Sequence, residues 1–141
     1  MSESDRKVVI VPCSGIGKTY GSVSREAACE VVEDLRPEAT ELVALSLLVL
    51  GDPEARALVA ASLAVTLDGC KLACATKIVK ESGGTVAEDI DVLEVHRCHR
   101  QLKPRGIAEL NEDGLGLSRV LAELAAAAVD RIRDGRGGDD A

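Results

Sequence analysis

The chain has 141 residues, a formal net charge of −7 and an apolar content of 46%, which fits one ordinary domain with a single core. Because phenylalanine and tryptophan are absent and Tyr20 is the only aromatic residue, the core must be aliphatic, and the chain lacks the stacking platforms and the basic surface with which proteins hold nucleic acid. No apolar run approaches the roughly 20 residues of a membrane span, so we expect a cytoplasmic protein that binds neither membrane nor nucleic acid.

The first half of the chain alternates strand and helix patterns. Residues 7–11 form a β-branched run, which predicts a strand buried on both faces. Apolar residues at helical spacing predict a helix over 22–35, which Pro37 ends. Residues 41–50 are apolar enough for a second strand and the start of a turn, although a helical segment before Gly51 fits the same pattern.

A short helix and two further strands follow. Asp52 can cap a helix over 53–61 that has a proline at its first position. Residues 63–67 predict the third strand, and a helical pattern covers 71–82. Residues 85–95 predict a fourth strand, placed in the second half of that segment.

The last third of the chain contains a connector and a long helix. Residues 96–106 form a basic connector, and residues 111–133 carry the longest helical signal of the chain. Strands that alternate with helices predict a mainly parallel sheet with helices on both faces. We expect a single three-layer α/β domain of about four strands over 1–133 and a disordered tail over 134–141.

The five cysteines are the most informative residues for function. Their number is odd and we expect no secretion signal, which favours metal, cluster or thiol chemistry over a disulfide framework. Cys13 follows the first predicted strand and Cys70 the third, so both belong to loops at the carboxyl edge of the sheet, where such folds bind ligands. Cys74 lies one helical turn beyond Cys70. We expect the three thiols to meet near a helix N-terminus, which favours thiolates.

The turn after the first strand predicts a site for a small anion. Backbone N–H groups of such a turn can bind a phosphate, a carboxylate or a sulfur species, although a plain tight turn has the same pattern. A nucleotide-binding P-loop would need glycine where this chain has Pro12. The candidate anion-binding residues are Ser14, Gly15, Gly17, Lys18 and Arg25.

Three further features allow more than one interpretation. His96, Cys98 and His99 lie close enough in the basic connector to hold a transition metal, or they form a solvated surface. Asp68 can orient a thiol, act as a base or cap the helix that follows. Cys29 lies within a helix that already supplies core residues, so we interpret it as a core residue.

Taken together, the motifs resemble those of a known family. A segment over 11–18 that contains Cys13 is followed about fifty residues later by Asp68-Gly69-Cys70 and then by Cys74. This combination resembles the DGC-domain proteins, a small prokaryotic family named for that triplet and described as zinc-binding. The resemblance covers about residues 7–130. It implies a metal site at the three cysteines, supported by Asp68 and Gly69, and no established reaction.

The chain departs from the family pattern after the second predicted strand. Many members have a further cysteine there, where this chain has Ala44, with Ser46 nearby. A closed tetrahedral zinc site would therefore need its fourth ligand from elsewhere, with Cys98 and His96 as the candidates.

Three functional hypotheses remain open. A zinc-binding module would use the three thiolates together with water or a fourth protein ligand. A [4Fe–4S] cluster on the same thiolates would leave one iron free, which by analogy of site suggests an enzyme of sulfur metabolism, either a desulfidase or a sulfur transferase. Metal-free chemistry would use Cys70 as a nucleophile. The expected ligand is a small anionic or sulfur-containing molecule, and the sequence does not identify a protein partner.

Overall fold

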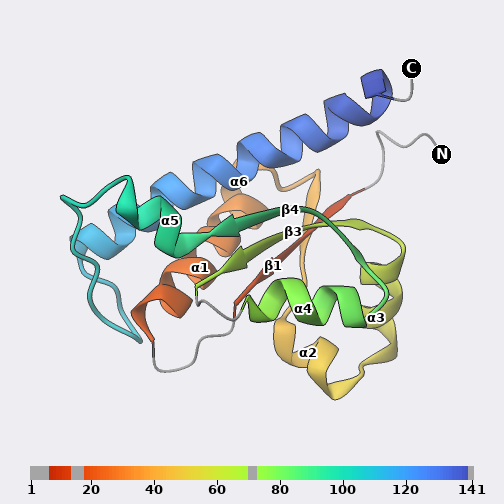
Figure 1. Ribbon diagram of the computed structural model, residues 1–141, viewed down its shortest axis with the longest axis horizontal. Coiled ribbons are helices and arrows are strands. Elements are labelled where there is room, and N and C mark those ends of the chain that lie inside the picture. Colours follow the sequence, from red (N-terminus) through yellow and green to blue (C-terminus); the bar gives the residue numbers. More distant parts are fainter. Residues whose placement is uncertain (1–6, 14–17, 70–72, 140–141) are drawn as a thin grey trace.

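The computed structural model describes residues 7–13, 18–69 and 73–139, with side chains as far as residue 134. Its centre is a sheet of four parallel strands in the order β2-β1-β3-β4, with helices on both faces (Figure 1). The predicted α/β fold is therefore confirmed. The strands are β1 (Val8–Pro12), β2 (Thr40–Leu42), β3 (Leu63–Asp68) and β4 (Thr85–Asp91).

Strand β1 lies in the middle of the sheet. Val8 pairs with Thr40 of β2 on one side and with Leu63 of β3 on the other. All five residues of β1 are buried, as a β-branched run between two helical layers requires. The strand ends at Pro12, whose nitrogen has no hydrogen to donate to the ladder.

One face of the sheet is covered by α1 (Thr19–Glu30), the π-helical turn η2 (Val31–Leu35), α5 (Val92–Arg97) and α6 (Glu112–Asp139). The core on this face is aliphatic, as predicted. Small side chains allow α1 and α6 to approach closely, and leucines of α6 reach the strands. The cluster includes Val8, Ile10, Val23, Ala27, Val65, Leu67, Leu117, Leu121 and Ala125.

Helices α2 (Leu45–Leu50), α3 (Pro53–Ala60) and α4 (Cys74–Glu81) cover the opposite face (Figure 1). Successive residues of a strand point to opposite faces, so Val9 and Val11 of β1 belong to this second core. The predicted helix cap is present, since Asp52 Oδ2 accepts a hydrogen bond from the Ala55 N–H at 2.9 Å.

The segment 41–50 contains both of the structures that its pattern allowed. Strand β2 ends at Leu42, and α2 begins three residues later. Helical geometry buries Leu45 and Leu48 on one side of α2, and Gly51 ends the helix in the left-handed conformation with φ of 80°.

The fourth strand occupies the first half of residues 85–95, so its predicted place in the second half was wrong. The strand ends at Asp91, whose Oδ1 accepts a hydrogen bond from the Leu93 N–H at 2.9 Å. That bond is an N-terminal cap. It starts α5 within a segment whose apolar residues suit either structure.

Two helices differ in extent from their predictions. Helix α1 begins at Thr19, three residues before the predicted start, and passes into η2, where the Arg36 N–H donates to the Val31 carbonyl at 2.7 Å. Helix α6 continues to Asp139, past the predicted end at 133, although this added segment contains three glycines, which disfavour a helix.

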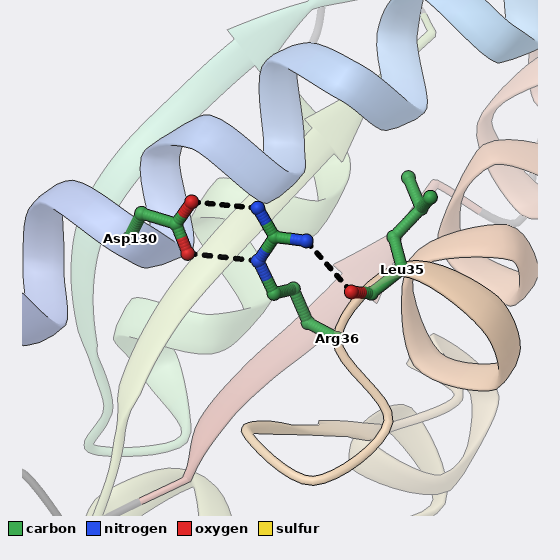
Figure 2. A network of polar contacts seen from close by, with 3 residues as sticks. All are labelled: Leu35, Arg36 and Asp130. Atoms are coloured by element: carbon green, nitrogen blue, oxygen red, sulfur yellow. Dashed lines mark hydrogen bonds and ion pairs between the residues drawn. The ribbon is translucent and has the colours of Figure 1, made fainter.

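An ion pair joins the end of η2 to α6 (Figure 2). The Arg36 guanidinium donates two hydrogen bonds to the Asp130 carboxylate, at 2.8 and 2.6 Å. Its remaining terminal nitrogen donates to the Leu35 carbonyl at 2.7 Å, which satisfies an acceptor at the helix end. Within the part of the chain that the structure describes, no helix is long and apolar enough to cross a membrane.

Candidate thiol site

Cys13 lies at the carboxyl end of β1, beside the end of β3. Its backbone N–H donates to the Leu67 carbonyl at 2.7 Å, which continues the β1–β3 pairing by one residue. Its side chain is only 3% exposed. The neighbouring residue on β3 is Asp68, whose side chain is also buried, so a thiol and a carboxyl group lie at adjacent strand ends.

Asp68 attaches the first turn of α4 to the end of β3. Its Oδ1 accepts from the Ala75 N–H at 2.8 Å, and its Oδ2 accepts from the Thr76 hydroxyl at 2.7 Å. These are the hydrogen bonds of a capping carboxylate, made from six residues before the helix begins. The chain enters α4 through Ala73, which has the unusual φ of 52° for a residue with a Cβ atom.

Cys74 is the first residue of α4, directly before the residue that Asp68 holds. It is half-buried and packs against the core between the sheet and α2–α4. Cys13 and Cys74 therefore belong to the same edge of the sheet, one after β1 and one at the start of the helix that follows β3. Cys70 lies between Asp68 and Cys74 in the chain, outside the described residues.

A second carboxyl group, Asp89, joins Asp68 and two threonines in a polar cluster. Thr66 Oγ1 lies 2.8 Å from Thr76 Oγ1 and donates to Asp89 Oδ1 at 3.2 Å. Burial raises the pKa of Asp89, and hydrogen bonding to Asp68 and the charge of Asp68 raise it further. These effects favour the protonated form of Asp89. Sequence reasoning missed Asp89, because only the strand register brings it opposite Thr66.

Gly69 is required because the loop after β3 touches α1. A Cβ atom at this position would lie 2.8 Å from the Tyr20 carbonyl oxygen and 3.2 Å from Ser24 Oγ. The first contact is with backbone, which cannot move aside cheaply. Asp68 thus holds the first turn of α4, and Gly69 allows the backbone directly after β3 to approach α1.

The connector histidines are both engaged within the protein. His96 Nδ1 lies 2.7 Å from the Tyr20 hydroxyl and Nε2 lies 2.8 Å from the Leu102 carbonyl. The carbonyl can only accept, so Nε2 carries the proton and Nδ1 accepts from Tyr20. Metal binding by His96 would break one of these bonds. His99 Nδ1 lies 3.0 Å from the Val95 carbonyl, and Cys98 is exposed at the end of α5.

The candidate anion-binding residues fall in two groups. Ser14, Gly15 and Gly17 lie outside the described residues. Lys18 is exposed immediately before α1, while Arg25 is half-buried in that helix and donates to Ser22 Oγ at 3.2 Å.

Cys29 and Ala44 line one pocket together with Pro12, the residue directly before Cys13. Burial raises the pKa of the Cys29 thiol, and the charges of Glu33 and Glu26 raise it further. Ala44 is exposed at the start of α2. Among residues 7–13, 18–69 and 73–134, no three Cys, His, Asp or Glu side chains form a group suited to a metal ion.

Fold and site together define an α/β protein with cysteine-bearing loops at the carboxyl edge of a parallel sheet. The family model of the DGC domain matches residues 9–113, which include Cys13, the Asp68-Gly69-Cys70 triplet and Cys74. The chain belongs to the DGC-domain family, as its motifs predicted. No curated protein and no solved structure matches it.

Proposed function

We propose that this protein is a metal-binding module in which the thiolates of Cys13, Cys70 and Cys74 hold zinc at the carboxyl edge of the sheet. The main support is the hydrogen bond from the Cys13 N–H to the Leu67 carbonyl. Through that bond Cys13, the residue after β1, adjoins the end of β3. Strand β3 ends at Asp68, and Gly69 and Cys70 follow it directly in the chain. Thiolate sulfur is a preferred zinc ligand.

The described residues of the proposed site suit a thiolate-bound metal. Cys13 is buried, which would shield a metal–sulfur bond from water. Cys74 lies in the first turn of α4, where the helix dipole favours a negative sulfur. Asp68 keeps that turn against β3. When bound at such a site with an open position, zinc acts as a Lewis acid on water or on a ligand.

The fourth coordination position distinguishes zinc from its main alternative. Because Ala44 follows β2, this chain offers no thiol at that point. Zinc would then take water, a small anionic or sulfur-containing ligand, or the exposed Cys98 as its fourth ligand. Three thiolates also match a [4Fe–4S] cluster with one free iron. The same alanine therefore supports, as a second candidate, an enzyme of sulfur metabolism that removes or transfers sulfur.

Cysteine substitutions test the proposed ligand set. We expect Cys13→Ser, Cys70→Ser and Cys74→Ser each to abolish stoichiometric zinc after dialysis, measured by metal analysis of the purified protein. Cys29→Ser is the matched control and should keep its zinc, since Cys29 lies within α1 and is not among the proposed ligands. Full zinc retention in a Cys70→Ser/Cys74→Ser double variant would refute the proposed ligands. Loss of zinc in Cys98→Ser would make the connector the source of the fourth ligand.

A further inference from the structure

Helix α2 is apolar on its outer side as well as on its buried side. Leu45 and Leu48 face the core, yet four of the seven large apolar side chains that are exposed in the described part of the chain lie in and beside this helix. They are Leu42 of β2 and Leu47, Val49 and Leu50 of α2, which we call the α2 patch. Helix α2 lies at the lower rim of the molecule in Figure 1. A helix that is apolar all round is normally covered on all sides, so the α2 patch indicates a surface that binds another molecule.

The α2 patch borders an acidic hollow. A pocket of about 330 Å³ beside the patch is lined by Leu42, Leu47, Leu58, Glu41, Asp52 and Glu54, among others. Residues 37–55 contain no lysine, arginine or histidine. Glu41 and Glu54 are exposed, and neither forms an ion pair or a side-chain hydrogen bond with the residues that the structure describes. Both carboxylates are therefore available to a cationic partner.

The open edge of β2 offers little to an added strand. The Ala39 carbonyl and the Val43 N–H both bond to β1, so the backbone groups that face away from β1 are those of Thr40 and Leu42. Thr40 is buried, which leaves the backbone of Leu42 alone for a new strand. Side chains must therefore carry the binding, and an amphipathic helix is the form of peptide that binds through one apolar face.

We propose that the α2 patch is the docking surface for an amphipathic helix of another protein, with aliphatic residues on one face and lysine or arginine beside them. The aliphatic face covers Leu47 and Leu50, and the cations lie towards Glu41 and Glu54. A second copy of this chain would bring the same carboxylates and a net charge of −7, which disfavours contact between two α2 patches. The inference needs no bound metal and goes beyond the proposed function.

A synthetic leucine–lysine peptide, with its leucines on one helical face, is the probe for the apolar contact. We would titrate it into the ¹⁵N-labelled full-length protein and follow the amide resonances by NMR, expecting shifts over residues 41–58. Leu50→Ser should weaken binding about tenfold, because the Leu50 side chain leaves water at the contact. Leu124→Ser removes an exposed leucine from α6 and should bind like the unaltered protein. Shifts that map elsewhere, or unchanged binding by Leu50→Ser, would overturn the proposal.

Charge variants test the acidic side of the surface. A peptide with glutamate in place of every lysine should bind at least about tenfold more weakly, because like charges then face each other. Glu41→Gln and Glu54→Gln should each weaken binding of the lysine peptide about two- to fivefold in low salt. Glu123→Gln, at an exposed position of α6, is the control and should leave it unchanged. Equal binding of the lysine and glutamate peptides would overturn the basic partner.

Two further measurements distinguish the proposed helix from other occupants. Light scattering should give the unaltered protein and Leu50→Ser the same molecular mass. A larger mass that Leu50→Ser abolishes would make a second copy the occupant and overturn the proposal. Phosphatidylcholine vesicles should not sediment the protein, and sedimentation that Leu50→Ser abolishes would assign the α2 patch to a lipid surface instead.

Discussion

At the scale of single residues, Asp68 and Asp89 are the two carboxyl groups of the polar cluster that contains Thr66 and Thr76. Asp68 uses both oxygens to hold α4 and is 2% exposed. Asp89 lies on β4, at the edge of the sheet, and shares the two threonine hydroxyls of the cluster. A raised pKa in the folded state means that the folded protein binds this proton more tightly than the unfolded chain does.

The pair predicts an unusual dependence of stability on pH. The stabilising contribution of Asp89 is complete below the pKa of the unfolded chain and is lost as the pH rises through the raised folded pKa. Asp89→Asn, which mimics the protonated acid, should therefore raise the thermal midpoint at pH 7 and lose most of that advantage at pH 4. Thermal unfolding at the two pH values checks this. Asp134→Asn is the exposed control, and a lower midpoint for Asp89→Asn at pH 7 would contradict the raised pKa of Asp89.

Cys29 and Cys98, which are not among the three proposed zinc ligands, should differ in reactivity. The raised pKa of Cys29 leaves little thiolate near neutral pH, while Cys98 is exposed. With iodoacetamide at pH 7, mass spectrometry should find Cys98 labelled well before Cys29. The rate at Cys29 should then rise as the pH is brought towards 9. Equal initial rates at pH 7 would show that the neighbouring carboxylates do not suppress the Cys29 thiolate.

At the scale of elements, the loop after β3 depends on its close contact with α1. Gly69→Ala places a methyl group against the Tyr20 carbonyl, so it should destabilise the protein by about 1–3 kcal/mol in denaturant unfolding. Gly116→Ala is the matched control. It lies inside α6 with its nearest side-chain neighbour at 3.6 Å, and should stabilise the helix by about 0.5–1 kcal/mol. If Gly69→Ala and Gly116→Ala changed the free energy of unfolding equally, the close contact between Gly69 and the Tyr20 carbonyl would be contradicted.

The ion pair between η2 and α6 should contribute modestly, because the Arg36 and Asp130 side chains are 36% and 48% exposed. Asp130→Ala should cost about 0.5–1 kcal/mol in low salt. The bidentate bond to Arg36 lowers the pKa of Asp130, so its contribution is present above the unfolded pKa and lost as the pH falls through the lowered one. Between pH 7 and pH 3, the free energy of unfolding should therefore fall less for Asp130→Ala than for the unaltered protein.

The elements show how far periodicity predicts this fold. The buried β1 run and the capped helix at Asp52 followed from local patterns. The extent of β4 did not, because an aspartate cap at Asp91 converts apolar residues that also suit a strand into α5. The end of β2 was equally ambiguous, since Leu45 and Leu48 could be buried either in a longer strand or in a helix.

At the scale of the whole molecule, parallel topology was enough to predict that Cys13, directly after β1, adjoins the end of β3. It was not enough to predict the carboxyl pair. The β3–β4 register shifts between Ala64 and Val65, which places Asp89 beside Thr66. Without that shift, Glu88 would occupy the position. Such an irregularity depends on packing over the whole sheet and leaves no local sign in the sequence.

Anaerobic purification, followed by metal analysis and a visible spectrum of the same sample, tests the proposed zinc site. We expect about one equivalent of zinc, as a single tetrahedral site would hold, and no visible absorption band. About four irons with acid-labile sulfide would contradict zinc and establish the cluster alternative. A protein that retains no metal, with Cys13, Cys70 and Cys74 all reduced, would contradict the metal site itself.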